Sequence, residues 1–207
     1  MKLRTAIALI VSMFAAVVAT APIAAAQEAP TCAGKSATIV ADGPGELAGT
    51  DGDDVIVGSS GIDIIDAGPG NDIICGLGGA DIIKGGLGRD LIQGNNGADD
   101  IRGGLGPDVI NGGDGNDIIR AGFGDDVVFG GANADFIAGG PGIDIALGGL
   151  GDDTVLGGNG SDRIEGGKGD DFMGGGNGTD TVRGGPGADE LFGGGGRLDF
   201  LLSLIHI

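Results

Sequence analysis

Aspartate recurs at every ninth position over most of this 207-residue chain, and these carboxylates are the side chains best suited to chemistry. The series runs through sixteen residues without insertion or deletion. Its members are Asp54, Asp63, Asp72, Asp81, Asp90, Asp99, Asp108, Asp117, Asp126, Asp135, Asp144, Asp153, Asp162, Asp171, Asp180 and Asp189. Evenly spaced carboxylates supply the oxygen ligands that hard cations such as calcium take. The series therefore predicts a repeat architecture with one candidate metal ligand in each repeat.

The repeating unit is nine residues long, and a clear copy is Gly112–Arg120, with the sequence GGDGNDIIR. Numbered from that first glycine, sixteen copies fill residues 49–192, and the aspartate is at position six. Position eight is apolar in every copy, from Ile56 to Leu191, and position four is Gly except at Asn133. One nonapeptide alone could not bury its apolar residue, so the copies are expected to stack on one another.

This unit fits the pattern G-G-x-G-x-D-x-U-x, where U is a large apolar residue, and it resembles the RTX, or haemolysin-type, calcium-binding repeat. The resemblance covers residues 49–192. It implies an all-β fold, a right-handed parallel β-roll (a β-solenoid) in which two nonapeptides form one turn, giving about eight turns. It also implies that calcium lies between the loops of successive turns. The position-six aspartates are then the side-chain ligands, and loop carbonyl oxygens complete the coordination shell.

The residue preferences within the repeat agree with that implied fold. Positions one to six are rich in glycine, which permits positive φ and close backbone approach, so we expect them to form a tight loop. Asn133 suits position four because Asn tolerates the left-handed region better than most residues. Positions seven to nine favour a short strand, in which position eight faces inward and positions seven and nine face outward.

Two copies per turn would place Asp54 above Asp72 and Asp63 above Asp81, with about 4.8 Å between turns. Carboxylates this close repel one another unless a cation lies between them. Calcium suits such a site, whereas magnesium requires a stricter octahedron, and loops without His or Cys disfavour zinc and copper.

In an alternative interpretation, the position-six aspartates only stabilise turns through hydrogen bonds to their own backbone. That interpretation does not explain why Asn and Ser never replace Asp at position six. Both residue types occur at neighbouring positions of the repeat, for example as Asn96 and Ser60 at position three.

The composition of the chain excludes several functional classes. Thirty acidic residues against eleven basic ones give a net charge of −19, which excludes nucleic acid as a partner and disfavours anionic membrane surfaces. The 50 Gly and 7 Pro residues would indicate disorder if they were not arranged in a repeat, so we expect the chain to be ordered only with metal. His206 is the only histidine, and the sequence contains no nucleophile–base set, zinc helix or phosphate loop. We therefore expect no enzymatic activity.

Residues 1–26 are predicted to be a secretory signal peptide. Lys2 and Arg4 precede an apolar run over residues 6–18, and three alanines end the segment before Gln27. The alternative, an uncleaved membrane anchor, is disfavoured because the apolar run is short. The expected location is secreted, or extracellular, and the form of the signal favours a bacterial origin. Cleavage would leave nine basic and thirty acidic residues, a net charge of −21, with no membrane insertion.

Residues 27–48 are predicted to form an N-terminal leader and cap, since Leu47 falls in phase with position eight. The leader contains Cys32, and the third copy contains Cys75. Two cysteines in an exported chain favour a disulfide bond. The alternatives are two free thiols, or pairing with another molecule.

Alternate copies carry an apolar residue at position seven. These residues are Val55, Ile73, Leu91, Val109, Val127 and Ile145. They would stack along one outer face, which becomes polar at Arg163 and Thr181. Either this pattern reflects strand propensity alone, or it forms an exposed apolar strip for self-association or contact with a cell surface.

Residues 193–207 are predicted to be a degenerate tail. Leu198 stands where the next aspartate is due, and Asp199 follows one residue late. The segment is either a short cap strand or, as we prefer, an extraneous or truncated end.

We therefore predict an extracellular calcium-binding repeat protein whose β-roll folds on binding calcium. The alternative is a truncated fragment of a larger secreted RTX enzyme, toxin or adhesin, in which the roll serves folding and export.

The number of ions follows from the repeat and from the charge. Sixteen copies stacked two per turn leave fourteen gaps, whereas a net charge of −21 is neutralised by about ten divalent ions. We expect the weakest sites where the loops depart most from the pattern. These are the copy that contains Ala132 and Asn133, and the first two copies, with Thr50, Ser59 and Ser60 in place of Gly.

Overall fold

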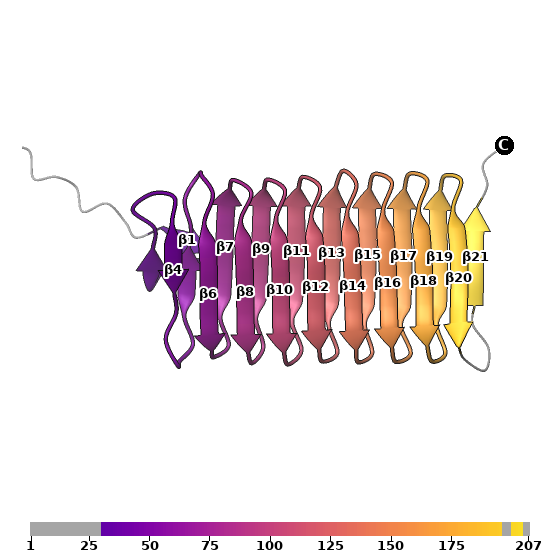
Figure 1. Cartoon of the computed structure of the whole chain (residues 1–207), viewed down its shortest axis with the longest axis horizontal. Helices are drawn as coiled ribbons and strands as arrows, with labels where there is room; N and C mark the ends of the chain where they lie inside the picture. Colours follow the sequence, from indigo (N-terminus) through magenta and orange to yellow (C-terminus); the bar gives the residue numbers. More distant parts are fainter. Residues whose placement is uncertain (1–29, 196–199, 205–207) are drawn as a thin grey trace, which may run out of the picture.

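The computed structural model describes residues 30–195 and 200–204, and within them the chain forms strands and no helix. Two parallel sheets face each other along a straight rod, and the chain alternates between them at every strand (Figure 1). Partner residues in neighbouring strands of one sheet are eighteen positions apart, as in Ile101 with Ile119 and Ile110 with Val128. The prediction of a parallel β-solenoid with two nonapeptides per turn is therefore confirmed.

One sheet has nine strands and the other has ten, which gives about nine turns. The nine-stranded sheet contains β4 (Glu46–Ala48), β6 (Ile64–Pro69), β8 (Ile82–Leu87), β10 (Asp100–Leu105), β12 (Ile118–Phe123), β14 (Phe136–Pro141), β16 (Thr154–Asn159), β18 (Phe172–Asn177) and β20 (Glu190–Gly195). The ten-stranded sheet contains β3 (Ile39–Val40), β5 (Val55–Val57), β7 (Ile73–Gly78), β9 (Leu91–Asn96), β11 (Val109–Asp114), β13 (Val127–Ala132), β15 (Ile145–Leu150), β17 (Arg163–Lys168), β19 (Thr181–Pro186) and β21 (Phe200–Leu204).

Each full strand is six residues long and covers positions seven to nine of one copy and positions one to three of the next. The expectation that positions one to six form a loop is thus wrong for positions one to three. These glycines pair within the ladder, as Gly104 does with Gly122, and only positions four to six form the turn. Alternation along the strand then directs positions six, eight and one of the next copy to the interior.

The turn needs residues that accept positive φ. At position four, Gly115 has φ +140°, and a Cβ added there would collide with the carbonyl oxygen of Gly97 in the preceding turn. Asn133, the one exception at position four, has φ 78°, as its residue type predicted.

The core is one ladder of position-eight side chains between the sheets. Ile56 to Val182 are buried at this position in every copy, and Leu191 at the last copy is partly buried against them. The prediction that position eight faces inward is confirmed. Each rung is narrow, because the neighbouring inward positions are aspartate and, in most copies, glycine.

The leader adds to the roll at its N-terminal end. Ile39 of β3 pairs with Ile56, and Leu47 of β4 pairs with Ile65, so both extend the apolar ladder. This accounts for the turn beyond the eight expected from the repeats alone.

The leader also forms a separate antiparallel hairpin from β1 (Thr31–Cys32) and β2 (Lys35–Ser36). A disulfide joins Cys32 to Cys75, with 5.8 Å between their Cα atoms. Cys32, Cys75 and Val57 form a small second cluster, against which Val55 and Ile73 pack. The leader therefore covers the first two residues of the apolar strip.

The remaining position-seven residues of that strip stack in register on the outer face of the ten-stranded sheet. Val109 and Ile145 are exposed there, at 37% and 38% of their surface. Farther along, β21 pairs with β19 with Phe200 opposite Thr181, nineteen residues apart, and the register shifts so that Leu204 lies opposite Pro186, eighteen residues apart. The signal segment 1–26, Leu198, Asp199 and His206 lie outside the described residues. No helix in the described part of the chain is long and apolar enough to cross a membrane.

The two sides of one strand give a test of the ladder. Ile119 is fully buried, whereas the adjacent Ile118 is 41% exposed on the outer face. Ile119→Ala should lower the free energy of unfolding by about 2–5 kcal/mol, because it leaves a cavity. Ile118→Ala, the matched control, should change it by about 0.5 kcal/mol or less. Denaturant unfolding of both variants in calcium checks this, and equal effects would contradict the inward assignment of position eight.

Candidate metal centre

The position-six aspartate is the last residue before each strand, and its carboxylate points into the roll. From Asp72 to Asp189, the Oδ1 atom of each accepts a hydrogen bond from the backbone N–H of the aspartate one turn earlier. Asp99 N–H, for example, donates to Asp117 Oδ1 at 2.9 Å, and Asp117 N–H donates to Asp135 Oδ1 at 2.8 Å. These bonds stack the aspartates of odd copies in one column and those of even copies in another, so the predicted stacking is confirmed.

All sixteen predicted ligands lie within the described residues. Fifteen are buried, with 7% or less of their surface exposed, and Asp189 at the end of the rod is partly exposed. Burial of so many carboxylates inside a narrow roll requires partners for both oxygens of each.

The second oxygen, Oδ2, has no such partner in most copies. It is buried without a hydrogen bond in Asp72, Asp81, Asp90, Asp99, Asp108, Asp117, Asp126, Asp135, Asp144, Asp153, Asp162, Asp171 and Asp189. A buried polar atom without a partner is rare in proteins and calls for an explanation such as a bound ion.

The glycine at position one lies directly against this oxygen. A Cβ added to Gly157 would lie 2.6 Å from Asp162 Oδ2 and 2.6 Å from the carbonyl oxygen of Gly175 in the next turn. The carboxylate oxygen and a backbone oxygen of the next turn therefore converge over one glycine. This contact was not predicted from the sequence, because position one was expected to lie in a loop.

Two copies depart from glycine at position one. Ala67 and Ala121 stand there, and both are fully buried. Their methyl groups occupy the place that other copies leave open beside the carboxylate.

Burial raises the pKa of these carboxyl groups. The loss of hydration is the largest cause, and it raises the pKa of Asp108 and Asp135 from 3.8 to about 7. For Asp108 the hydrogen bond from the backbone of Asp90 lowers the pKa and the stacked carboxylates of Asp90 and Asp126 raise it, and the value of about 7 includes all of these causes.

The same causes act along both columns. The pKa rises to about 6 in Asp81, Asp90, Asp99, Asp144, Asp153 and Asp171, and it is also raised in Asp72, Asp117, Asp126 and Asp162. The columns thus favour either protons or a cation.

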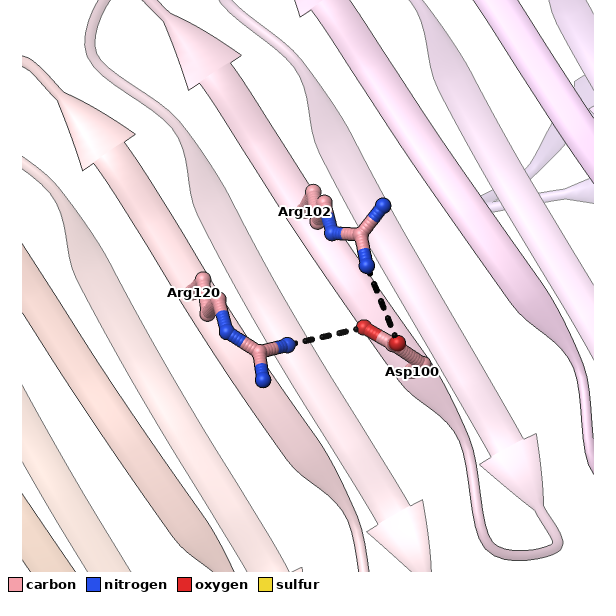
Figure 2. Close-up of polar contacts among 3 residues, drawn as sticks. All are labelled: Asp100, Arg102 and Arg120. Atoms are coloured by element: carbon pink, nitrogen blue, oxygen red, sulfur yellow. Dashed lines mark hydrogen bonds and ion pairs between the residues drawn. The ribbon is translucent and has the colours of Figure 1, made fainter.

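The neighbouring residue Asp100 shows how this chain compensates a carboxylate with its own cations. Asp100 lies at position seven on the outer face, where Arg102 and Arg120 bind its two oxygens at 3.2 and 3.0 Å (Figure 2). Asp99, one residue earlier, points inward, and the ion pairs of the described residues do not include it. The outer carboxylate has protein cations as partners, whereas the inner one does not.

The donor set fits calcium. Each site offers a carboxylate oxygen and backbone carbonyl oxygens, which are ligands of the type that calcium prefers. Over the residues that the structure describes, no three His, Cys, Asp or Glu side chains gather at one point, so backbone oxygens and water must complete the shell. Calcium would supply the positive charge that the inward columns lack.

Comparison with known families agrees with this geometry. The RTX calcium-binding nonapeptide repeat matches residues 48–83, 76–110, 102–137, 111–146, 138–173, 147–182 and 174–197. No curated protein matches the chain. The matched segments extend over more than half of the sequence and include every position-six aspartate. The chain therefore belongs to the family of RTX calcium-binding nonapeptide repeat proteins.

Proposed function

We propose that this protein is an exported calcium-binding rod whose β-roll folds when calcium binds. The buried Oδ2 atoms without partners carry this proposal. They form two columns of negative charge that the polypeptide does not neutralise, and calcium is the cation that suits an all-oxygen site. The signal-like residues 1–26 support export. Outside the cell the protein would meet enough calcium to fill such sites.

Calcium would favour folding by lowering the free-energy cost of burying the two columns of carboxylates. Folding without metal must remove the carboxylates from water and stack them, and it must also order a chain with 50 glycines. The apolar ladder buries only one side chain per copy, so its contribution to the free energy of folding is small. A cation that binds only the folded state shifts the equilibrium toward that state.

We further propose that the protein acts by binding calcium and stiffening, not by catalysis. The described residues place mainly Asp, Gly and apolar side chains in the interior. The Thr50 and Thr38 hydroxyl groups contact Asp54, where both donate a hydrogen bond to its carboxylate. A rod with calcium in its interior would serve as a rigid spacer or scaffold outside the cell.

Removal of calcium gives the first test of this proposal. The calcium-free protein beginning at Gln27 should show the far-ultraviolet circular dichroism of a disordered chain, and roughly millimolar calcium should restore a β-sheet spectrum. Magnesium at the same concentration should restore less, because it retains its water ligands. A full β-sheet spectrum in chelator would refute calcium-dependent folding.

The number of bound ions gives a second test. Equilibrium dialysis should find about ten to fourteen calcium ions per chain, the range set by charge neutrality and by the gaps between copies. Asp117→Asn should weaken the sites shared with Asp99 and Asp135, because their hydrogen bonds join these three residues in one column. The outer Asp100→Asn is the matched control and should leave the count unchanged. A count of one or two ions would mean that the aspartates are only turn residues.

The dependence on pH follows from the raised pKa values. A folded carboxyl group with a raised pKa holds its proton to a higher pH than in the unfolded chain, so the calcium-free roll is most stable below pH about 4. Its stability should fall as the pH rises from about 4 to 7, through the values of Asp81 and Asp108.

Circular dichroism of the metal-stripped protein between pH 7.5 and 5 measures this dependence, with sedimentation to exclude precipitation near the isoelectric point. The β-sheet signal should grow on acidification. Asp108→Asn with Asp135→Asn should shift that growth to higher pH, because two fewer charges are buried. A β-sheet signal that diminishes on acidification would contradict the electrostatic account.

A further inference from the structure

The carboxylates of the first two copies differ from those of most later copies in their hydrogen bonds. Asp54 Oδ2 accepts from the backbone N–H of Thr50 at 2.7 Å and from its hydroxyl at 2.9 Å. Asp63 Oδ2 accepts from the backbone N–H of Ser59 at 2.6 Å. Each donor belongs to position two of the same copy. In the third copy the corresponding oxygen, Asp72 Oδ2, is buried without a partner.

The backbone at position two accounts for the difference. In later copies this residue has positive φ, as in Gly113 at +115°, and it lies within a strand. Thr50 and Ser59 do not have positive φ, which a β-branched residue such as Thr strongly disfavours. The strands before them, β4 and β5, end at Ala48 and Val57, so their N–H groups are directed to the carboxylates instead of to a ladder.

The leader supplies donors to the other carboxylate oxygens. Gly45 N–H donates to Asp63 Oδ1 at 2.8 Å, and the Thr38 hydroxyl lies 3.3 Å from Asp54 Oδ1. Both oxygens of both aspartates are therefore satisfied by the polypeptide. The hairpin that covers this end is also tied to the third copy by the Cys32–Cys75 disulfide.

We propose that the first two copies bind no metal, and that Thr50 and Ser59 do there what calcium does elsewhere. This inference rests on the proposed function, since it divides the repeats into calcium-dependent and calcium-independent copies. The leader and first turn then form a structure that persists without calcium. Its free strand edges offer the next turns a template, so the unfavourable first step of building a repeat stack is already complete.

Ion counting tests the division directly. Asp54→Asn with Asp63→Asn should lose no calcium, as measured by equilibrium dialysis on the protein beginning at Gln27. Asp108→Asn with Asp117→Asn, the same change in two interior copies, should lose at least two ions per chain. Loss of ions from the first pair as well would overturn the inference.

Hydrogen exchange in chelator tests the calcium-independent turn. Peptides over residues 46–66 should stay protected, while those over residues 100–190 exchange freely. Thr50→Gly with Ser59→Gly should abolish that protection, and Thr154→Gly with Ser161→Gly, an equal change in late copies, should preserve it. The inference is wrong if residues 46–66 exchange as fast as the rest.

The outcomes separate this inference from the proposed function. If the whole chain stays protected in chelator, or if no calcium binds, the proposed function fails. If calcium binds and orders the chain, but residues 46–66 also lose protection in chelator, only the separate role of the first turn fails.

Discussion

The burial of stacked carboxylates is the constraint on which the rest of this structure depends. Each turn places one aspartate on each edge, directly above another of the same charge, and in most interior copies only one of the two carboxylate oxygens is hydrogen-bonded to the backbone. An isolated buried charge is costly, so such a column is stable only if protons or cations neutralise it. Arginine serves this purpose on the outer face, at Asp100, whereas the ion pairs of the described residues include none of the inward aspartates from Asp72 to Asp171. The fold of the roll and the neutralisation of its inner carboxylates are thus linked.

Glycine makes this arrangement geometrically feasible. At position one the absence of a side chain lets the carboxylate lie against the backbone, where it also approaches a carbonyl oxygen of the next turn. At position four glycine permits the positive φ that closes a three-residue turn. The same residues make the unfolded chain entropically favourable, because glycine loses the most freedom on folding. The composition that forms the sites therefore also raises the entropic cost of folding.

The N-terminal end of the rod differs from the interior in how its aspartates are hydrogen-bonded. An interior copy receives hydrogen bonds from the turn before it and gives them to the turn after it. The first copies have no preceding repeat, and Thr38 and Gly45 donate to their Oδ1 atoms in its place. Thr50 and Ser59 donate to their Oδ2 atoms. The hairpin and its disulfide cover the adjacent outer face, where Val55 and Ile73 would otherwise be exposed. These features match the general need of repeat proteins for atypical terminal units.

The sequence by itself determined the repeat, the inward face of position eight and the identity of the candidate ligands, since a period of nine with invariant Asp and an apolar residue two positions later is sufficient for these. The solenoid with two nonapeptides per turn, and thus the pairing of residues eighteen apart, was implied by the resemblance of the repeat to the RTX family. The Cys32–Cys75 pairing remained one of several alternatives at that level, because two cysteines 43 residues apart do not reveal whether the chain brings them together.

Only the tertiary structure decided where the strands end and which way the carboxylates point. Glycine is a poor strand former by propensity, so positions one to three were expected in a loop, but pairing with identical residues one turn away holds them in the ladder. That pairing turns position six inward and brings it against position one of the same copy. The hydrogen bonds of Thr50 and Ser59 could likewise not be predicted from the sequence. They depend on a backbone conformation without positive φ, which is possible because β4 and β5 end before these residues. Contacts between turns, not local preference, therefore set the chemistry of each site.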